Sequence, residues 1–207
     1  GAMHATPGVT RMHLVDTTLF FSPTSGGVRR YLNAKHDWYT SQGQWRHSLL
    51  VPGCDTALLP GATSTIAGIK VPGTFNYRLP LSVRRWTQQL DALRPDIIEA
   101  GDAFHPAWSA LQIAAHRRIP AVAFFHSHLP RLVGKRCGAL AARLAGQYLR
   151  DVYQRFDLVF APSRIMCDYL RSIGLTSVQL QPLGVNTDVF HPARRNSTLR
   201  QHLGLEP

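Results

Sequence analysis

The chain has 207 residues and a mass of 23.0 kDa, a size at which one domain can bury a substantial core. Hydrophobic residues make up 44% and charged residues 17%, and the sequence holds no internal repeat or low-complexity tract, which excludes disordered, collagen-like and repeat architectures. The 23 Lys and Arg residues outnumber the 12 Asp and Glu residues, so the formal charge of +11 favours a phosphate-rich partner or an anionic membrane surface without deciding between them.

Short apolar segments alternate with amphipathic segments along the whole chain. In chain order they predict a strand at 12–17, a helix at 28–41, strands at 47–51 and 64–69, a helix at 82–93, a strand at 96–100, a helix at 106–117, a strand at 121–126, a helix at 135–156, a strand at 158–161, a helix at 162–173, a strand at 178–181 and a helix at 194–203. This alternation predicts an α/β fold with a doubly wound, mainly parallel sheet and helices on both faces.

Cysteine usage and the chain start bear on the compartment. The three cysteines, Cys54, Cys137 and Cys167, have no C-x-x-C spacing, which argues against a disulfide scaffold or a thiolate zinc site and favours a reducing, cytoplasmic compartment. The longest apolar run, 119–125, is too short to span a bilayer. Residues 1–3, Gly-Ala-Met, are interpreted as a remnant of an expression tag.

Two glycines follow the first predicted strand. In doubly wound sheets ligands bind at the carboxyl ends of the strands, where Gly26, Gly27, Asp102 and His126 are all predicted to lie. The glycines lack the Gly-Lys-Ser/Thr of a Walker loop, so they indicate either a tight turn with positive φ or backbone amides that receive a phosphate at a helix N-terminus. The two interpretations are compatible.

Two histidines follow the most apolar strand. His126 and His128 are two residues apart in an extended segment, which predicts that they point to the same side. No third ligand stands at metal-binding spacing, so we expect no metal site. Each histidine is either a structural hydrogen-bonding group at the strand end or a ligand contact. Asp102 has a similar pair of interpretations, as a ligand contact or as a cap of the following helix or its lead-in.

The predicted helix at 135–156 has an apolar side and a basic side. Apolar side chains recur every four residues from Leu140 to Phe156, whereas Arg136, Arg143 and Arg150 recur every seven and line another face. The simplest interpretation is a helix with a core side and a solvated side. The alternative is that the arginines contact an anionic membrane or another anion.

Five segments, taken in order, resemble the motifs of family 4 glycosyltransferases. They are F-S-P-T-S-G-G-V-R-R-Y at 21–31, P-D-I-I-E-A at 95–100, F-F-H-S-H at 124–128, D-L-V-F-A-P-S at 157–163 and P-L-G-V-N-T-D-V-F-H-P at 182–192. The resemblance implies one half of the GT-B architecture, in which two Rossmann-like domains face each other across a cleft. It implies that 4–192 form the N-terminal, acceptor-side domain, that 193–207 begin the linker region, and that the C-terminal donor domain is absent.

The resemblance also implies a reaction and a set of roles. The reaction is a retaining transfer of a hexose from a nucleotide sugar to a lipid or saccharide acceptor, without a metal or other cofactor. His126 would contact the transferred sugar near the reacting carbon, and Gly26 and Gly27 would face the donor phosphates. The candidates for acceptor binding are Asp102, Arg30 and His128. Because the donor domain would be missing, the chain alone is expected to be inactive.

Family members that glycosylate lipids resemble this chain in carrying a basic amphipathic helix after the histidine strand. The expected partners are therefore a nucleotide sugar, a sugar or lipid acceptor, the missing C-terminal domain and an anionic membrane surface, which would place the protein peripherally on the cytoplasmic membrane face. Two alternatives remain open: a complete, non-catalytic Rossmann-like domain that binds a sugar or nucleotide, and a nucleic-acid-binding module. The second is disfavoured because the sequence shows neither zinc-ligand spacing nor a recognition helix.

Overall fold

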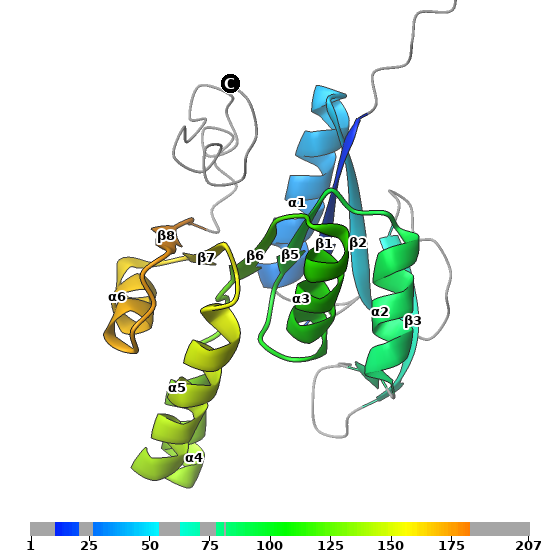
Figure 1. Cartoon of the computed structure of the whole chain (residues 1–207). Coiled ribbons are helices and arrows are strands. Elements are labelled where there is room, and N and C mark those ends of the chain that lie inside the picture. Colours follow the sequence, from blue (N-terminus) through cyan, green and yellow to red (C-terminus); the bar gives the residue numbers. More distant parts are fainter. Residues whose placement is uncertain (1–10, 21–26, 54–62, 71–77, 81, 183–207) are drawn as a thin grey trace, which may run out of the picture.

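The computed structural model describes residues 11–20, 27–53, 63–70, 78–80 and 82–182 (Figure 1). Gly26, Cys54, the connector from 183 to 192 and the predicted helix at 194–203 lie outside these residues. The strands are β1 (Met12–Thr17), β2 (Trp45–Gly53), β3 (Thr63–Lys70), β4 (Arg78–Pro80), β5 (Ile97–Ala100), β6 (Ala121–Phe124), β7 (Leu158–Ala161) and β8 (Val178–Leu180). The helices are α1 (Gly27–Gln42), α2 (Val83–Ala92), α3 (His105–Arg117), α4 (Leu129–Cys137), α5 (Ala139–Tyr153) and α6 (Arg164–Ser172).

The eight strands form one sheet in the order β4-β3-β2-β1-β5-β6-β7-β8. Every neighbouring pair is parallel except β3 and β4, which are antiparallel. The order reverses at β1, which lies between β2 and β5. This is the doubly wound, mainly parallel sheet expected from the alternation of strands and helices.

Helices cover both faces of the sheet. On one face, α1 packs Tyr31 and Leu32 against Leu49, Val51 and Phe124. On the other face, α2, α3, α5 and α6 enclose the larger core, which includes buried side chains of β1, β5, β6 and β7. The alternation along β2 assigns the odd-numbered residues 47, 49 and 51 to the α1 face.

Local signals in the sequence explain several element ends. Ser82 and Ser163 accept hydrogen bonds from the backbone N–H groups of Arg85 and Met166, so they are the N-caps of α2 and α6. Each hydroxyl satisfies an N–H group that the first helical turn cannot pair internally. The three-residue edge strand β4 was not predicted, because a segment this short has no readable period.

The prediction of one continuous helix at 135–156 is wrong. The structure has two helices, α4 and α5, which meet at Gly138 and pack against each other as a hairpin. Gly138 has a φ of 89°, a conformation that ends α4 and that L side chains rarely adopt. The two helices approach each other closely at Gly134, which has no side chain. A β-carbon at this position would lie only 3.0 Å from the Ala142 side chain.

The break changes the two predicted faces. Leu140 and Leu144 are 71% and 56% exposed, so the apolar stripe joins the core only further along α5, from Tyr148 onward. Arg136 belongs to α4, whereas Arg143 and Arg150 belong to α5, so the three arginines do not share the face of one helix. Within the described ranges, no helix combines the length and apolar character that crossing a membrane requires.

Candidate functional site

The carboxyl ends of β1, β5 and β6 lie at one edge of the sheet. Thr17 pairs with Ala100, and Ala100 pairs with Ala123, so the segments that follow these strands emerge side by side. Asp102 lies two residues beyond the end of β5, and His126 lies two residues beyond the end of β6. The predicted placement of Asp102 and His126 at the carboxyl edge of the sheet is therefore confirmed.

His126 is held by aromatic side chains. Its ring stacks on Phe124 with centroids 4.0 Å apart and an interplanar angle of 8°, and it meets the edge of Tyr31 at 5.5 Å. Burial lowers the pKa of His126 to about 4, so the imidazole is neutral at physiological pH. Its Nδ1 atom is buried and has no hydrogen-bond partner in the described part of the chain. The stacking on Phe124 and the contact with Tyr31 thus fix the ring in position.

Asp102 ties two loops together at the same edge. One carboxylate oxygen accepts hydrogen bonds from the Leu19 N–H at 2.7 Å and the Thr18 hydroxyl at 3.1 Å, and the other accepts from the Phe104 N–H at 2.9 Å. Phe104 is the N-cap residue of α3, so Asp102 braces the lead-in to that helix and does not cap it directly. Burial raises the pKa of Asp102 to about 6.

A cavity of about 180 Å³ lies between these two groups. His126, Asp102 and Gly101 line it at the sheet edge. Its other walls are mainly apolar and comprise Phe20, Ala103, Phe104, Phe125, Ser127, Leu129, Leu132, Leu149 and Tyr153. Gly101 is required by close packing, because a β-carbon there would lie 2.9 Å from the Thr18 side chain and 3.6 Å from the His126 ring.

Gly27 begins α1, the helix that carries Tyr31 against His126. Four residues of helix rise about 6 Å, so Gly27 lies roughly one turn from the contact with His126. Gly27 is not among the residues with positive φ, and a β-carbon there would meet no atom within 4 Å. The fold itself therefore does not demand glycine at this position. Arg30 is exposed on the same turn and does not line the cavity beside His126.

The prediction that His126 and His128 point to the same side is wrong. His128 packs against Phe125 and Tyr169, with its ring 4.0 Å from Tyr169, on the face opposite α1. The strand ends at Phe124, so the two-residue alternation does not continue to position 128. His128 instead begins α4, where its Nδ1 atom accepts a hydrogen bond from the Arg131 N–H at 3.1 Å.

His128 lines a second and larger cavity of about 460 Å³, between the α4–α5 hairpin and α6. Arg143 and Arg150 also line it, whereas Arg136 does not. Of the residues predicted to bind an acceptor or an anion, the structure thus brings His128 together with Arg143 and Arg150, and places Asp102 with His126 in the smaller cavity. Arg30 and Arg136 stand apart from both groups.

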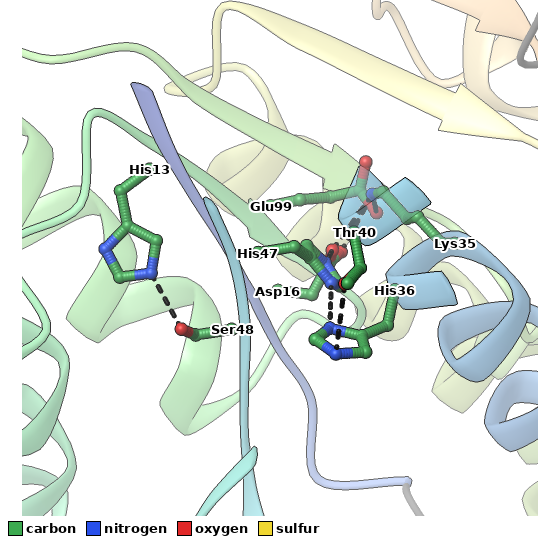
Figure 2. A network of polar contacts seen from close by, with 8 residues as sticks. All are labelled: His13, Asp16, Lys35, His36, Thr40, His47, Ser48 and Glu99. Carbon is green, nitrogen blue, oxygen red and sulfur yellow. Dashed lines mark hydrogen bonds and ion pairs between the residues drawn. The ribbon is translucent and has the colours of Figure 1, made fainter. Parts of the chain in front are cut away.

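A buried network of charged side chains lies between α1 and the sheet (Figure 2). The ammonium group of Lys35 contacts Asp16 at 3.0 Å and Glu99 at 2.9 Å. His47 hydrogen-bonds to the carboxylate of Asp16 through Nε2, and its Nδ1 atom lies 2.9 Å from Nδ1 of His36. Lys35, Asp16, Glu99 and His47 are each at most 5% exposed. We call these four residues the buried charge cluster.

Burial and neighbouring charges shift the pKa values of Lys35, Glu99 and His47. Burial alone lowers the pKa of Lys35, but the two carboxylates outweigh it and hold the pKa well above its usual value. Burial, with Asp16 close by, raises the pKa of Glu99 to about 7. Burial and the charge of Lys35 lower the pKa of His47 to about 3. The lysine therefore stays charged, the histidine stays neutral, and Glu99 titrates near neutrality.

Sequence reasoning missed the buried charge cluster and the residues that position His126. Lys35 looked like one more basic residue of a surface helix, Tyr31 ended the quoted 21–31 segment without a role of its own, and Gly101 stood in no quoted segment. The signals in the sequence were Asp16 and Glu99, charged residues inside otherwise apolar strands. Among the residues that the structure describes, no three His, Cys, Asp or Glu side chains could hold a metal ion.

Comparisons with known proteins give a consistent result. Residues 25–189 match the family model described as Glycosyltransferase Family 4. Over 202 residues the chain is 30% identical to a GDP-mannose-dependent alpha-(1-6)-phosphatidylinositol dimannoside mannosyltransferase of Mycobacterium tuberculosis. The match covers 92% of this chain and 51% of that protein. It is 26% identical over 133 residues to a GDP-mannose-dependent alpha-mannosyltransferase of Corynebacterium glutamicum, covering 64% of this chain and 32% of the relative.

Among solved structures, sucrose-phosphate synthase from Thermosynechococcus elongatus is similar with a TM-score of 0.64 at 15% identity, over 95% of this chain and 53% of that one. A lipopolysaccharide outer core galactosyltransferase is similar with a TM-score of 0.51 at 13% identity, over 81% of this chain and 44% of that one. These likenesses support the fold. The chain spans about half the length of the first curated relative that it matches.

Proposed function

Because the chain belongs to glycosyltransferase family 4, as the N-terminal half of a GT-B fold, we propose that its protein transfers a mannosyl group from GDP-mannose to a lipid-linked saccharide. The donor comes from the names of two relatives that are 30% and 26% identical to this chain, and the lipid acceptor comes from the name of the first alone. In this proposal the chain supplies the acceptor-side wall of the cleft. Donor binding then also requires the other half of the protein.

The observation that carries the proposal is the environment of His126. A neutral imidazole, locked by two aromatic rings at the carboxyl edge of the sheet, lines a cavity there. A sugar hydroxyl needs a fixed hydrogen-bonding group of this kind. Because the pKa of His126 is about 4, the ring offers a hydrogen bond without adding a positive charge near the reacting carbon.

Gly27 is proposed to admit the phosphates of the donor. It lies at the N-terminus of α1, where unpaired backbone N–H groups and the helix dipole favour an anion. The open space around its missing side chain allows close approach. As the bond to the sugar breaks, negative charge develops on the leaving phosphate, and backbone donors that are already in place stabilise it.

The α4–α5 hairpin is proposed to bring the protein to the membrane that holds the acceptor. In Figure 1 this hairpin extends away from the sheet. It exposes Leu132, Leu140 and Leu144, and it carries Lys135 and Arg136 as exposed basic residues. Exposed leucines beside basic groups fit a surface that inserts between anionic headgroups.

Turnover by the gene product that carries this chain tests the proposal. We expect transfer of radiolabelled mannose from GDP-mannose to a mannosylated phosphatidylinositol, with an α-linked product, and much slower transfer from UDP-glucose. The His126→Ala variant is the negative control. Turnover with a different nucleotide sugar would correct the donor, whereas the absence of any transfer with a panel of nucleotide sugars would overturn the proposed activity.

A further inference from the structure

The larger cavity, between the α4–α5 hairpin and α6, has no role in the proposed transfer. Its volume is about 460 Å³, and His128, Arg131, Arg143 and Arg150 line it together with six other residues. Those six are Pro130, Ala142, Gly146, Gln147, Tyr169 and Ile173. Its walls come from the start of α4, the middle of α5 and the end of α6, so three helices shape it.

The charged groups that line this cavity are all of one sign. Arg131, Arg143 and Arg150 contribute three guanidinium groups, and the described lining residues include no Asp or Glu. Within the described part of the chain, these three side chains make no ion pair, unlike Arg117 and Arg171, which pair with aspartates. Three guanidinium groups around one hollow, without a carboxylate to neutralise them, complement an anion.

His128 adds a donor with a fixed direction. Its Nδ1 atom accepts the hydrogen bond from the Arg131 N–H, so the proton of the neutral ring must be on Nε2. Burial lowers the pKa of His128, which favours this neutral form. The cavity therefore offers a histidine N–H group beside the guanidinium groups, and both kinds of donor suit the oxygens of a phosphate.

The rest of the cavity wall is apolar. Pro130, Ala142 and Ile173 supply aliphatic surface, and Tyr169 presents its ring beside His128. Gly146 keeps the hollow open, because a β-carbon there would lie 3.0 Å from the Tyr169 hydroxyl oxygen. A bare inorganic anion would leave this surface unused, whereas an anion attached to a carbon skeleton would cover it.

We propose that this cavity binds the phosphodiester of the acceptor's headgroup and thereby orients the acceptor toward His126. The inference rests on the proposed function in naming a lipid-linked acceptor as the source of the phosphate. His126 and His128 are separated by one residue, so their Cα atoms are at most about 7 Å apart. Their rings lie on opposite faces of the sheet, but both cavities border the start of α4, where Leu129 lines the smaller cavity and Pro130 lines the larger one. A polyol headgroup anchored by its phosphate in the larger cavity can therefore extend toward the smaller one.

Binding to soluble glycerophosphoinositol, measured by calorimetry without any donor, tests the site. The variant carries Arg143→Gln and Arg150→Gln. We expect its dissociation constant to rise about 10- to 100-fold, since each lost charge-assisted contact weakens binding several-fold or more. Arg84→Gln, on the exposed side of α2, is the matched control and should leave binding unchanged. Both cavity arginines are exposed, so the melting temperature of the variant should match the wild type.

Two further ligands identify the source of the anion. Free inositol, which lacks the phosphate, should bind at least 10-fold more weakly than glycerophosphoinositol. Vesicles of phosphatidylglycerol report on the membrane surface alone. Equal binding of inositol, or equal binding of the double variant and the wild type to glycerophosphoinositol, overturns the site. If the protein binds the vesicles but not the soluble headgroup, the proposed site is also overturned, because the arginines would then bind the charged membrane surface and not one phosphodiester.

This experiment separates the site from the proposed reaction. It reads binding without turnover, so it can succeed even if GDP-mannose proves to be the wrong donor. Conversely, mannosyl transfer by the gene product with unchanged KM for the acceptor in the double variant would leave the reaction standing and remove the cavity from it.

Discussion

Basic side chains on the two sides of the sheet differ in burial and in pairing. Under α1, Lys35 is 3% exposed and its ammonium group pairs with two carboxylates at 2.9 to 3.0 Å. On the α4–α5 hairpin, Arg143 and Arg150 are exposed and make no ion pair with any described residue. A buried charge that has all its partners inside the fold supports the scaffold, whereas an exposed charge without one is available to another molecule. Substitutions of these two kinds of charge should therefore differ in their cost to stability.

The largest effect is expected for Lys35→Met. The substitution leaves Asp16 and Glu99 buried without their cation, and breaking a buried ion pair in this way costs about 3–5 kcal/mol of unfolding free energy. Urea denaturation of the chain measures it. Lys135→Met, at an exposed lysine of α4, is the matched control and should change stability by less than about 0.5 kcal/mol. Equal losses of unfolding free energy in the two variants would show that the buried and the exposed lysine contribute alike to stability.

The next effect is a pH dependence carried by Glu99. Its pKa in the fold is about 7, above the ordinary value of 4.5, so the folded state holds the proton more tightly than the unfolded state. Its contribution to stability is therefore complete below about pH 4.5 and is lost as the pH rises through 7. Glu99→Gln cannot titrate, so its unfolding free energy relative to wild type should increase between these pH values.

Comparing Glu99→Gln with wild type at each pH cancels the contribution of His47. The pKa of His47 is lowered to about 3, so its stabilising effect is present above pH 6.5 and fades as the pH falls. A stability difference between the two proteins that stays constant from pH 4.5 to pH 7 would show that Glu99 does not titrate in this range.

His126→Ala should lower the rate of mannosyl transfer about 100-fold at saturating donor, because a positioned group at the reacting sugar contributes on that scale. The measurement is kcat of the gene product that carries this chain. His116→Ala, at an exposed histidine of α3, is the control and should retain full activity. A His126→Ala enzyme with wild-type kcat and a normal melting temperature would leave His126 with a structural role alone.

Gly27→Ala should weaken donor binding about 10-fold and leave stability unchanged. The structure has open space at the added methyl group, so only a bound phosphate would meet it. Gly101→Ala is the informative counterpart, because its methyl group would lie 2.9 Å from the Thr18 side chain and should destabilise the fold. Titration of the gene product with GDP-mannose, with thermal melts in parallel, separates the two cases.

The smallest effect on stability is expected for Leu140→Gln combined with Leu144→Gln. Both leucines are more than half exposed, so the change should stay within about 0.5 kcal/mol. Leu149→Ala on the same helix removes a side chain that is 1% exposed and should cost about 2–5 kcal/mol. If the two substitutions on the hairpin destabilise the chain as much as Leu149→Ala, those leucines are part of the core.

Local patterns in the sequence predicted most of the fold. The apolar strands and the serine caps identified the sheet and several helix starts, because those signals act over a few residues. The break at Gly138 was missed although a glycine there is a common helix terminator, because the basic and apolar repeats on either side continued the helical period. Helix periodicity does not distinguish one long helix from two that fold back on each other.

The candidate site was less predictable. Asp102 and His126 could be placed at the sheet edge, because parallel strands end at a common level. The separation of His126 from His128 could not, since it depends on where β6 ends and α4 begins. The buried charge cluster draws on three strands and one helix that are far apart in the chain, so only the tertiary structure shows which charges meet.

The position of β1 in the sheet sets an order of events during synthesis on the ribosome. Leu14 pairs with Ile97, so one neighbour of β1 emerges roughly 80 residues after it, about 4 to 16 s later at ordinary translation rates. Until then β2 is the only neighbour with which β1 can pair, and Lys35 can reach Asp16 but not Glu99. One edge of β1 therefore stays unpaired during translation until β5 has been synthesised. An unpaired strand edge can pair with another nascent chain, so this stage carries a risk of aggregation.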